Sequence, residues 1–402
     1  MKKSKRPVAA FVGVVVFGFV LYFVMLAIEP GLKPILFDYN TWLDNMASKP
    51  LWALMWMFGD ATEPHFHKSL FGGIFVFLGS IIAYVLDRNK SKLRLTPISY
   101  GNGVIWPWIF AAAFISMGIS TILFGSLRIE GDAWIGTFVP YVSIASAVIL
   151  IYGARVEVLF TGAILGAIFS TPITMFMRSA WLFPHQLPGI IGSVSGMWIG
   201  GIFVFEICHY LPWMKVNPNT VISPGKIDGE ISVEECKHLT PNKFFIRRMI
   251  ADYSEPMFVG NEIAGGALII GTLLSWGLNP LHPVYGMGIL PALLFSEILT
   301  GAISIFVYWN FWMEKDGWFP TFVPVVSVAP AMVIQFGTAM PIIIIGAVFG
   351  AISCPAMAMW INRKIPAHWH GMIGFTASMA INSFACDVLL RYLIQVFPFI
   401  AK

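Results

Sequence analysis

The sequence contains very little charge. Only 11% of its 402 residues are Asp, Glu, Lys or Arg, whereas 57% are hydrophobic. A soluble domain carries about 25% charged residues, because its surface faces water. The net charge of +4 is also too small to indicate nucleic-acid binding. The composition therefore excludes an ordinary soluble protein and predicts an all-α integral membrane protein.

Cysteines and catalytic motifs are scarce as well. The four cysteines form no CxxC pair and no framework of paired spacings, which argues against a structural metal or disulfides. No GxSxG, HExxH, phosphate-binding loop or dinucleotide fingerprint occurs at a usable position. The pairs His65/His67 and His368/His370 are expected on opposite sides of the membrane and lack further ligands. We expect no metal, no cofactor and no enzymatic activity.

Long apolar runs dominate the chain instead. A helix needs about 20 mostly apolar residues to cross a membrane, and eleven segments are candidates. They are residues 8–28, 69–86, 103–125, 134–152, 156–177, 187–211, 258–278, 284–311, 318–336, 339–361 and 370–398. The first has no small-x-small cleavage site after it, so we expect a retained helix rather than a signal peptide. The Trp-rich segment 50–58 is too short to cross and predicts an interfacial helix at the outer surface.

The distribution of Lys and Arg indicates the orientation. With a cytoplasmic N-terminus, the inner loops hold seventeen of these residues, and the outer loops with the C-terminus hold six. This asymmetry follows the positive-inside rule. It predicts a protein of the cell inner (cytoplasmic) membrane with an external C-terminus.

The two halves of the sequence resemble each other. The matched pairs are Glu63-Pro64 with Glu255-Pro256, Gly72-Gly73 with Gly265-Gly266, Tyr100-Gly-Asn-Gly with Tyr285-Gly-Met-Gly, and Trp134-x-x-Thr-Phe-Val-Pro140 with Trp318-x-x-Thr-Phe-Val-Pro324. The matches keep their order and are mostly Gly and Pro, which argues against chance. Five spans per copy would force opposite orientations. We therefore predict a helix at 1–28, an external segment at 29–68, a membrane repeat at 69–211, a cytoplasmic linker at 212–257 and an inverted repeat at 258–402.

Inverted repeats are typical of secondary transporters. The sequence thus predicts alternating-access transport of a small hydrophilic solute, such as an organic anion or another nutrient, coupled to H⁺ or Na⁺. A passive channel or facilitator is the main alternative, and a membrane-embedded enzyme or an assembly factor is a third. The expected partners are the solute, the coupling ion and the lipid bilayer, with no nucleic acid; a homodimer is the assembly we consider.

The repeated Trp-x-x-Thr-Phe-Val-Pro motif is the first candidate for substrate binding. Proline disfavours helix at the residue before it, so each motif predicts either an unwound, cavity-lining segment or a simple helix start anchored by Trp. On the first interpretation, the substrate-binding candidates are Thr137, Pro140, Thr321 and Pro324, with Asn261 and Gln335 as further polar candidates.

Glu297 is the main candidate for ion coupling. It lies near the middle of segment 284–311, where a charge costs about 3 kcal/mol on insertion scales. We predict that it binds H⁺ or Na⁺ with help from Ser296 and Thr300, and that Glu262 is a further contributor. The alternative is a neutral glutamic acid that is hydrogen-bonded to a neighbouring helix.

An acid and a base share a helix face near the end of the last span of each copy. The pairs are Glu206 with His209 and Asp387 with Arg391, at spacings of three and four residues. They are candidate gate or relay residues. The alternative is that they are side chains that reach water at the ends of the spans.

Overall fold

The structure is a computed structural model that describes residues 6–127, 129, 132, 134–216, 239–313 and 318–401. Within these ranges the chain is helical and contains no strand. The central part of the expected linker, residues 217–238, lies outside the described residues, as do several of the loop Lys and Arg residues.

Eight helices among the described residues are long and apolar enough to cross a membrane. They are α1 (Val8–Ile28), α4 (Leu70–Arg88), α5 (Trp106–Phe124), α7 (Val156–Met177), α8 (Ile190–Tyr210), α12 (Leu290–Val307), α15 (Met340–Asn362) and α16 (Met372–Val396). An apolar helix of 17 residues, α11 (Glu262–Leu278), is slightly shorter. The chain is therefore a helical membrane protein, as its composition predicts.

Two of the eleven expected spans are not continuous helices. Residues 134–143 and 318–327 lack α-helix, and only the second half of each segment forms one, α6 (Ile144–Tyr152) and α14 (Val328–Phe336). Each helix has nine residues and is about 13 Å long, whereas the hydrocarbon core is about 30 Å thick. The break expected around Pro140 and Pro324 is present, and a count of eleven full spans is not confirmed.

Two shorter helices enter the protein from regions that we expected outside the membrane. The expected interfacial helix is α3 (Pro50–Asp60), whose last turn is buried at Trp56 and Asp60. The second such helix, α10 (Pro241–Asp252), lies in the expected linker and buries Arg248 and Asp252. The remaining short elements are α2 (Tyr39–Asn45), α13 (Trp309–Met313) and the short turns of helix at Glu29–Gly31, Glu63–His65, Gly101–Gly103, Arg178–Leu182, Glu255–Met257, Val284–Gly286 and Pro398–Ala401.

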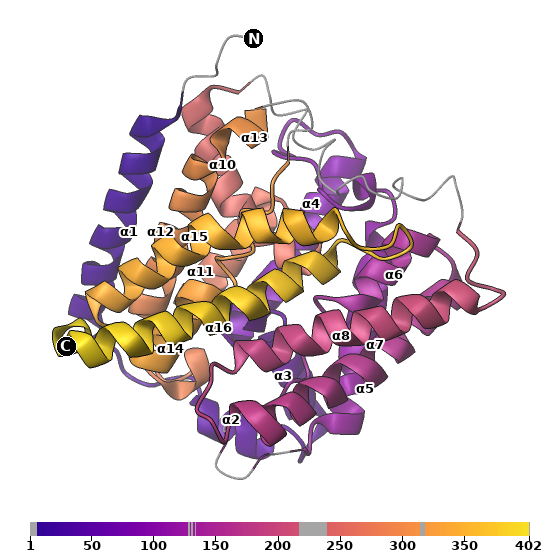
Figure 1. Cartoon of the computed structure of the whole chain (residues 1–402), viewed down its shortest axis with the longest axis horizontal. Helices are drawn as coiled ribbons and strands as arrows, with labels where there is room; N and C mark the ends of the chain where they lie inside the picture. Colours follow the sequence, from indigo (N-terminus) through magenta and orange to yellow (C-terminus); the bar gives the residue numbers. More distant parts are fainter. Residues whose placement is uncertain are drawn as a thin grey trace.

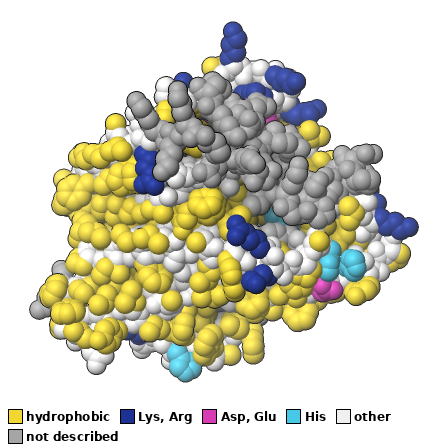
Figure 2. All heavy atoms as spheres, turned by 45° about the horizontal axis from the view of Figure 1, so that its top comes forward, with side chains coloured by type: hydrophobic (Ala, Val, Ile, Leu, Met, Phe, Trp, Pro, Cys, Tyr) yellow, Lys and Arg dark blue, Asp and Glu magenta, His cyan; other side chains and the backbone are white. Residues whose placement is uncertain are grey.

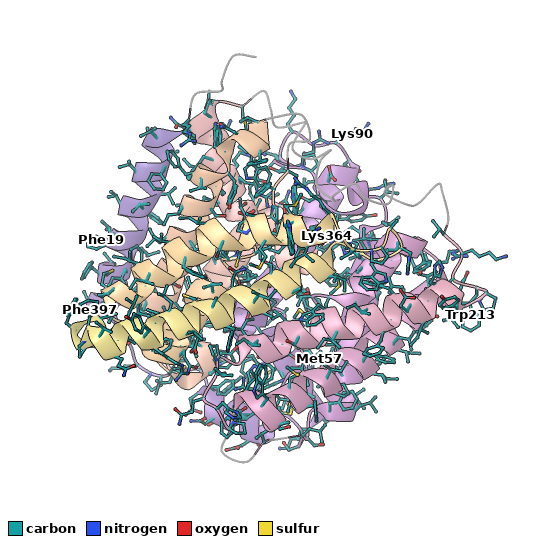
Figure 3. All side chains as sticks on the ribbon, viewed as in Figure 1. Phe19, Met57, Lys90, Trp213, Lys364 and Phe397 are labelled. Carbon is teal, nitrogen blue, oxygen red and sulfur yellow. The ribbon has the colours of Figure 1, made fainter. Side chains whose placement is uncertain are left out.

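The long helices pack in layers. α8 and α16 lie side by side across the front of Figure 1, and α1 lies along the left edge beside α12. Hydrophobic side chains cover most of the left part of the face in Figure 2, and Lys and Arg gather mainly near its top and right. In Figure 3, Phe19 and Phe397 lie at the left edge of the molecule and Trp213 at the right edge. An apolar outer surface of this kind is expected where helices face lipid.

Gly73 and Gly265 allow α3 and α10 to pack against the helices that follow them. A Cβ atom at Gly73 would lie 1.7 Å from the carbonyl oxygen of Phe58, and one at Gly265 would lie 1.9 Å from that of Ile250. We expect Gly73→Ala and Gly265→Ala each to lower thermal stability strongly in detergent, because the clash is with backbone that cannot move aside alone. Gly277→Ala is the matched control, since no atom of another segment lies within 4 Å of its Cβ position. Equal melting temperatures for all three variants would contradict this packing.

Candidate functional site

Two similar turns carry charged residues into the centre of the protein. A short 3₁₀ turn at Glu63–His65 follows α3, and one at Glu255–Met257 follows α10. Each ends at a phenylalanine with left-handed backbone, Phe66 (φ 60°) and Phe258 (φ 58°). This conformation is uncommon for a bulky residue. It reverses the chain so that the helix before each turn and the helix after it pack together.

The first turn builds the Lys68 cluster, which consists of Asp60, Glu63 and Lys68. The Lys68 ammonium donates to Asp60 and, over 2.9 Å, to Oε2 of Glu63, and all three side chains are buried. Thr137 donates to the other oxygen of Asp60 over 2.7 Å and accepts from Trp56 over 2.9 Å. The Lys68 ammonium also lies 3.5 Å from the centre of the Trp56 ring. The cluster thus ties three segments together: α3, the turn after it and the non-helical segment 134–143.

The second turn builds the Arg248 cluster, which consists of Arg248, Asp252 and Glu255. Arg248 donates to Oδ1 of Asp252 over 2.7 Å and to Oε1 of Glu255 over 2.6 Å. Thr321 donates to Oδ2 of Asp252 over 2.8 Å. Ser99 also donates to Oε1 of Glu255, over a longer 3.5 Å. Asp252 and Thr321 therefore have the same relation to each other as Asp60 and Thr137.

Each cluster holds two carboxyl groups against one base. Burial raises the pKa of Glu63 to about 8, against the opposing effect of Lys68. Burial also raises the pKa of Asp252 to about 6, against the opposing effect of Arg248. Desolvation disfavours the charged form of an acid, and a nearby cation favours it. In each cluster the two buried carboxyl groups outnumber the single base that pairs with them.

A third buried group lies between the clusters. Nε2 of His67 is 3.0 Å from Oε2 of Glu297 on α12, and Nδ1 is 3.2 Å from the hydroxyl of Thr272 on α11. His65 stacks on Tyr253, with ring centres 5.1 Å apart and planes at 8°. Tyr253 is close enough to Glu297 to interact with it electrostatically. Glu297 is thus fully buried and paired with a residue from the turn after α3.

The expected helpers of Glu297 bond elsewhere. Ser296 donates to the carbonyl of Leu293 over 2.7 Å, and Thr300 donates to that of Ser296 over 2.6 Å. Both hydroxyls therefore bond to the backbone of their own helix. The structure brings Glu297 together with His67 instead.

Two cavities lie beside these groups. The wide cavity, of about 340 Å³, is lined by Glu63, Trp134, Phe138, Arg178, Ile190, Gln335 and further residues of the segments around them. The narrow cavity, of about 60 Å³, is lined mainly by apolar side chains, together with Glu255 and His370. Phe138 and Ile190 line both cavities, so the two spaces adjoin. Together they reach the lower end of the range for small-molecule sites, roughly 300–1,000 Å³.

The predicted substrate residues take different places around the cavities. Gln335 lines the wide cavity and donates to the carbonyl of Gln186 over 2.7 Å. Thr137 and Thr321 bond to the carboxylates of the two clusters and do not appear in either cavity wall. Pro140 and Pro324 also lie behind the walls, which are formed by the neighbouring residues 138, 142, 322 and 326.

Asn261 and Glu262 hold a loop in place. Asn261 begins α11 and its side-chain amide donates to the carbonyl of Arg94 over 3.1 Å and also to that of Thr96. Glu262 accepts from the backbone amide of Thr96 over 2.9 Å and pairs with Arg247. These contacts fix the loop before α5, and neither residue lines a cavity.

The two acid and base pairs each contact the other half of the chain. Arg391 pairs with Asp387 over 2.7 Å on α16 and donates to the carbonyl of Gln186, in the loop before α8. Glu206 on α8 accepts from His368 over 2.8 Å and from Trp369 over 2.7 Å, in the loop before α16.

His209 also takes part in the contact between α8 and the loop before α16. It packs on His368 with ring centres 4.3 Å apart. Both predicted pairs thus connect the last helix of one half to a loop of the other, and we call these contacts the Arg391 latch and the Glu206 latch.

The sequence reasoning missed most members of the clusters, because they lie in segments that it placed outside the membrane. The cluster members to which the sequence assigned no role in the site are Asp60, Glu63, Lys68, Arg248, Asp252 and Glu255. One signal could have found them. The number of residues between Asp60 and Asp252 equals the number between Glu63 and Glu255, which the repeat already matches. The two aspartates therefore occupy equivalent positions in the repeat.

The described residues contain no group of three or more His, Cys, Asp and Glu side chains arranged to hold a metal ion. No protein-family model matches the chain, and no curated protein sequence matches it. Its function is therefore inferred from the geometry of the clusters and cavities.

Proposed function

We propose that the protein is a secondary active transporter that moves a small hydrophilic solute by alternating access, coupled to H⁺ or Na⁺. The observation that carries this proposal is a pair of adjoining cavities next to buried charged clusters. The wide cavity is lined by α8, α14 and segment 134–143, and the narrow cavity by α8, α16 and both non-helical segments. Binding at the junction of broken helices is characteristic of secondary transporters. A buried ionisable residue in a membrane protein is a functional candidate by default.

We further propose that the two halves are inverted copies of one unit. The matched structural features are the carboxylates Asp60 and Asp252, the hydroxyls Thr137 and Thr321, the left-handed Phe66 and Phe258, and the close approaches at Gly73 and Gly265. These pairs place α3 and α10 at the start of each copy. They also pair Gly73 with Gly265, one residue from the register that the sequence comparison suggested.

The rims of the cavities support the proposed topology. The exposed rim of the wide cavity includes Phe183 and Gln186, from a loop that the distribution of Lys and Arg places outside. The narrow cavity is bounded by Tyr100 and His370, from loops expected inside. In this orientation the two cavities lie on one path across the membrane.

Proton coupling is the better-supported form of this proposal. A hard cation such as Na⁺ favours several oxygen ligands, but the close polar neighbours of Glu297 include the ring nitrogen of His67. The nearby hydroxyls of Ser296 and Thr300 donate to their own helix. An imidazole beside a carboxylate is suited to gaining and losing a proton.

Uptake by the purified protein in liposomes tests the function. We expect labelled solute from a nutrient panel to accumulate above its external concentration when a pH gradient is imposed, and not in liposomes without protein. Flux that only equilibrates, with no response to a pH or Na⁺ gradient, would indicate a channel or facilitator. No flux of any solute would contradict transport.

Alternating access also predicts opposite effects of the two latches. In a variant without native cysteines, Ser193→Cys would report access to the wide cavity through its rate of labelling by a membrane-impermeant maleimide. Arg391→Gln should speed labelling about twofold to fivefold, because a partly exposed ion pair contributes up to about 1 kcal/mol. Glu206→Gln should slow it. Equal rates for both variants would contradict a gating role.

A further inference from the structure

The two clusters differ in how their glutamates are satisfied. In the Lys68 cluster, Oε2 of Glu63 accepts from Lys68, and Oε1 accepts from Trp134 and, over 3.4 Å, from Tyr285. In the Arg248 cluster, both donors to Glu255 reach Oε1. Within the described part of the chain, no donor reaches its Oε2, although the residue is only 1% exposed.

The equivalent donor in the second copy does not fill this position. Trp318 occupies the place in the repeated motif that Trp134 occupies in the first copy. Its ring packs against Phe322 and Phe375, and its indole N–H has no acceptor among the described residues. Glu255 therefore keeps an acceptor that its counterpart Glu63 has already used.

Glu255 is one of the residues that line the narrow cavity, so its carboxyl group belongs to a wall that a ligand could contact. A buried charged group without its hydrogen-bond partner costs free energy, which a donor from a ligand would recover. The other walls are apolar, including Phe138, Phe322, Met197 and Met379. They suit the hydrocarbon part of a ligand and exclude water from the ion pair.

The charge around the cavities favours a cation over an anion. The Arg248 cluster has two carboxylates for one guanidinium, which leaves one excess negative charge. The cation in the wall of the wide cavity, Arg178, already donates to Asp132 over 2.8 Å. It also lies 4.4 Å from the centre of the Trp134 ring. An anionic ligand would have to displace these partners.

We propose that Oε2 of Glu255 binds the ammonium group of an amine-bearing solute whose apolar body occupies the narrow cavity. This inference rests on the proposed transport function, because the amine would be the transported substrate. It replaces the organic anion among the sequence-based expectations. The ammonium neutralises the excess charge of the Arg248 cluster and satisfies the oxygen that the protein leaves unpaired.

Four compounds that share a 3-methylbutyl group test the chemistry on the wild-type protein. They are 3-methylbutylamine (ammonium only), leucine (ammonium and carboxylate), 4-methylpentanoate (carboxylate only) and 3-methylbutanol (neutral). We expect 3-methylbutylamine, leucine or both to raise the melting temperature of the purified protein with saturable dependence on concentration. Stabilisation by leucine alone would identify a zwitterion. Stabilisation by 4-methylpentanoate without the amines, or no stabilisation by either amine-bearing compound, would overturn the proposal.

Glu255→Gln tests the residue. Arg248 keeps its contact with Asp252 in this variant, and the melting temperature without ligand reports whether the fold persists. We expect the affinity for the stabilising amine to fall about tenfold to a hundredfold, as for a hydrogen bond to a charged group. Glu157→Gln is the matched control, since that carboxylate is on the surface at the start of α7. Unchanged affinity in Glu255→Gln would overturn the assignment.

The uptake experiment separates this inference from the transport function. Gradient-driven uptake of a solute that has no amine would contradict the role of Glu255 and leave the transport function standing. Absence of all uptake, with amine binding intact, would contradict transport and leave the binding site standing.

Discussion

Replacing Lys68 by methionine is expected to prevent the protein from reaching its folded state. Lys68 is fully buried and is the cation that pairs with Asp60 and Glu63. Methionine preserves much of the side-chain volume but leaves two buried carboxyl groups without their base. Removing one partner of a buried ion pair costs about 3–5 kcal/mol, which is a large fraction of the stability of most domains.

The measurement is the yield of monodisperse protein in detergent and its melting temperature. Lys90→Met is the matched control, because Lys90 is exposed after α4. Adding Asp60→Asn to Lys68→Met should restore part of the stability, because it removes one of the two unpaired acids. A Lys68→Met protein as stable as the Lys90→Met control would show that the cluster contributes little to folding.

The membrane class and the broken segments could be predicted from the sequence because they depend on local properties. Apolar runs reveal spanning helices through their length. Pro140 and Pro324 disfavour helix at the residue before them whatever surrounds them, and α6 and α14 begin only after these prolines. The burial of Glu297 also follows from its place within an apolar run.

The charged clusters could not be predicted in the same way. The helices α3 and α10 have only 11 and 12 residues, so a criterion based on length places both outside the membrane. A hydropathy scale assigns a fixed free-energy cost to burying Lys68 or Arg248. The actual cost depends on the carboxylates that other segments of the fold place beside these side chains. Lys68 needs Asp60 and Glu63, and only the turn after α3 brings the three together.

His67 shows the same limit over a longer separation. The His-x-His pattern suggested only a metal site, which lacked further ligands. Its actual partner, Glu297, is 230 residues away in the sequence. A contact between residues so far apart in the sequence becomes visible only in the three-dimensional structure. The acid and base pairs at Glu206 and Asp387 were predicted from spacing, but their partners in the opposite loops were not.

Replacing Glu297 by glutamine is expected to abolish accumulation driven by a pH gradient. Glutamine keeps the size of the side chain and a hydrogen bond to His67, so the fold should persist. It cannot gain or lose a proton at neutral pH. If the His67–Glu297 pair carries the coupling proton, the variant should still exchange labelled for unlabelled solute, because exchange requires no net proton movement. Net uptake against a concentration gradient should fall at least about tenfold, as for the loss of about 1.4 kcal/mol of coupling.

The pH dependence of uptake distinguishes a coupling role from a merely structural one. Wild-type uptake should increase as the external pH falls, because the protein must bind the coupling proton before it carries the solute inward. Uptake by Glu297→Gln should not respond to the external pH. Glu157→Gln, with its carboxylate on the surface, should behave like the wild type in both assays. A Glu297→Gln protein with normal uptake rate and normal pH dependence would remove Glu297 from the coupling mechanism. The two clusters would then be the next candidates to test, because each holds two buried carboxyl groups against one base.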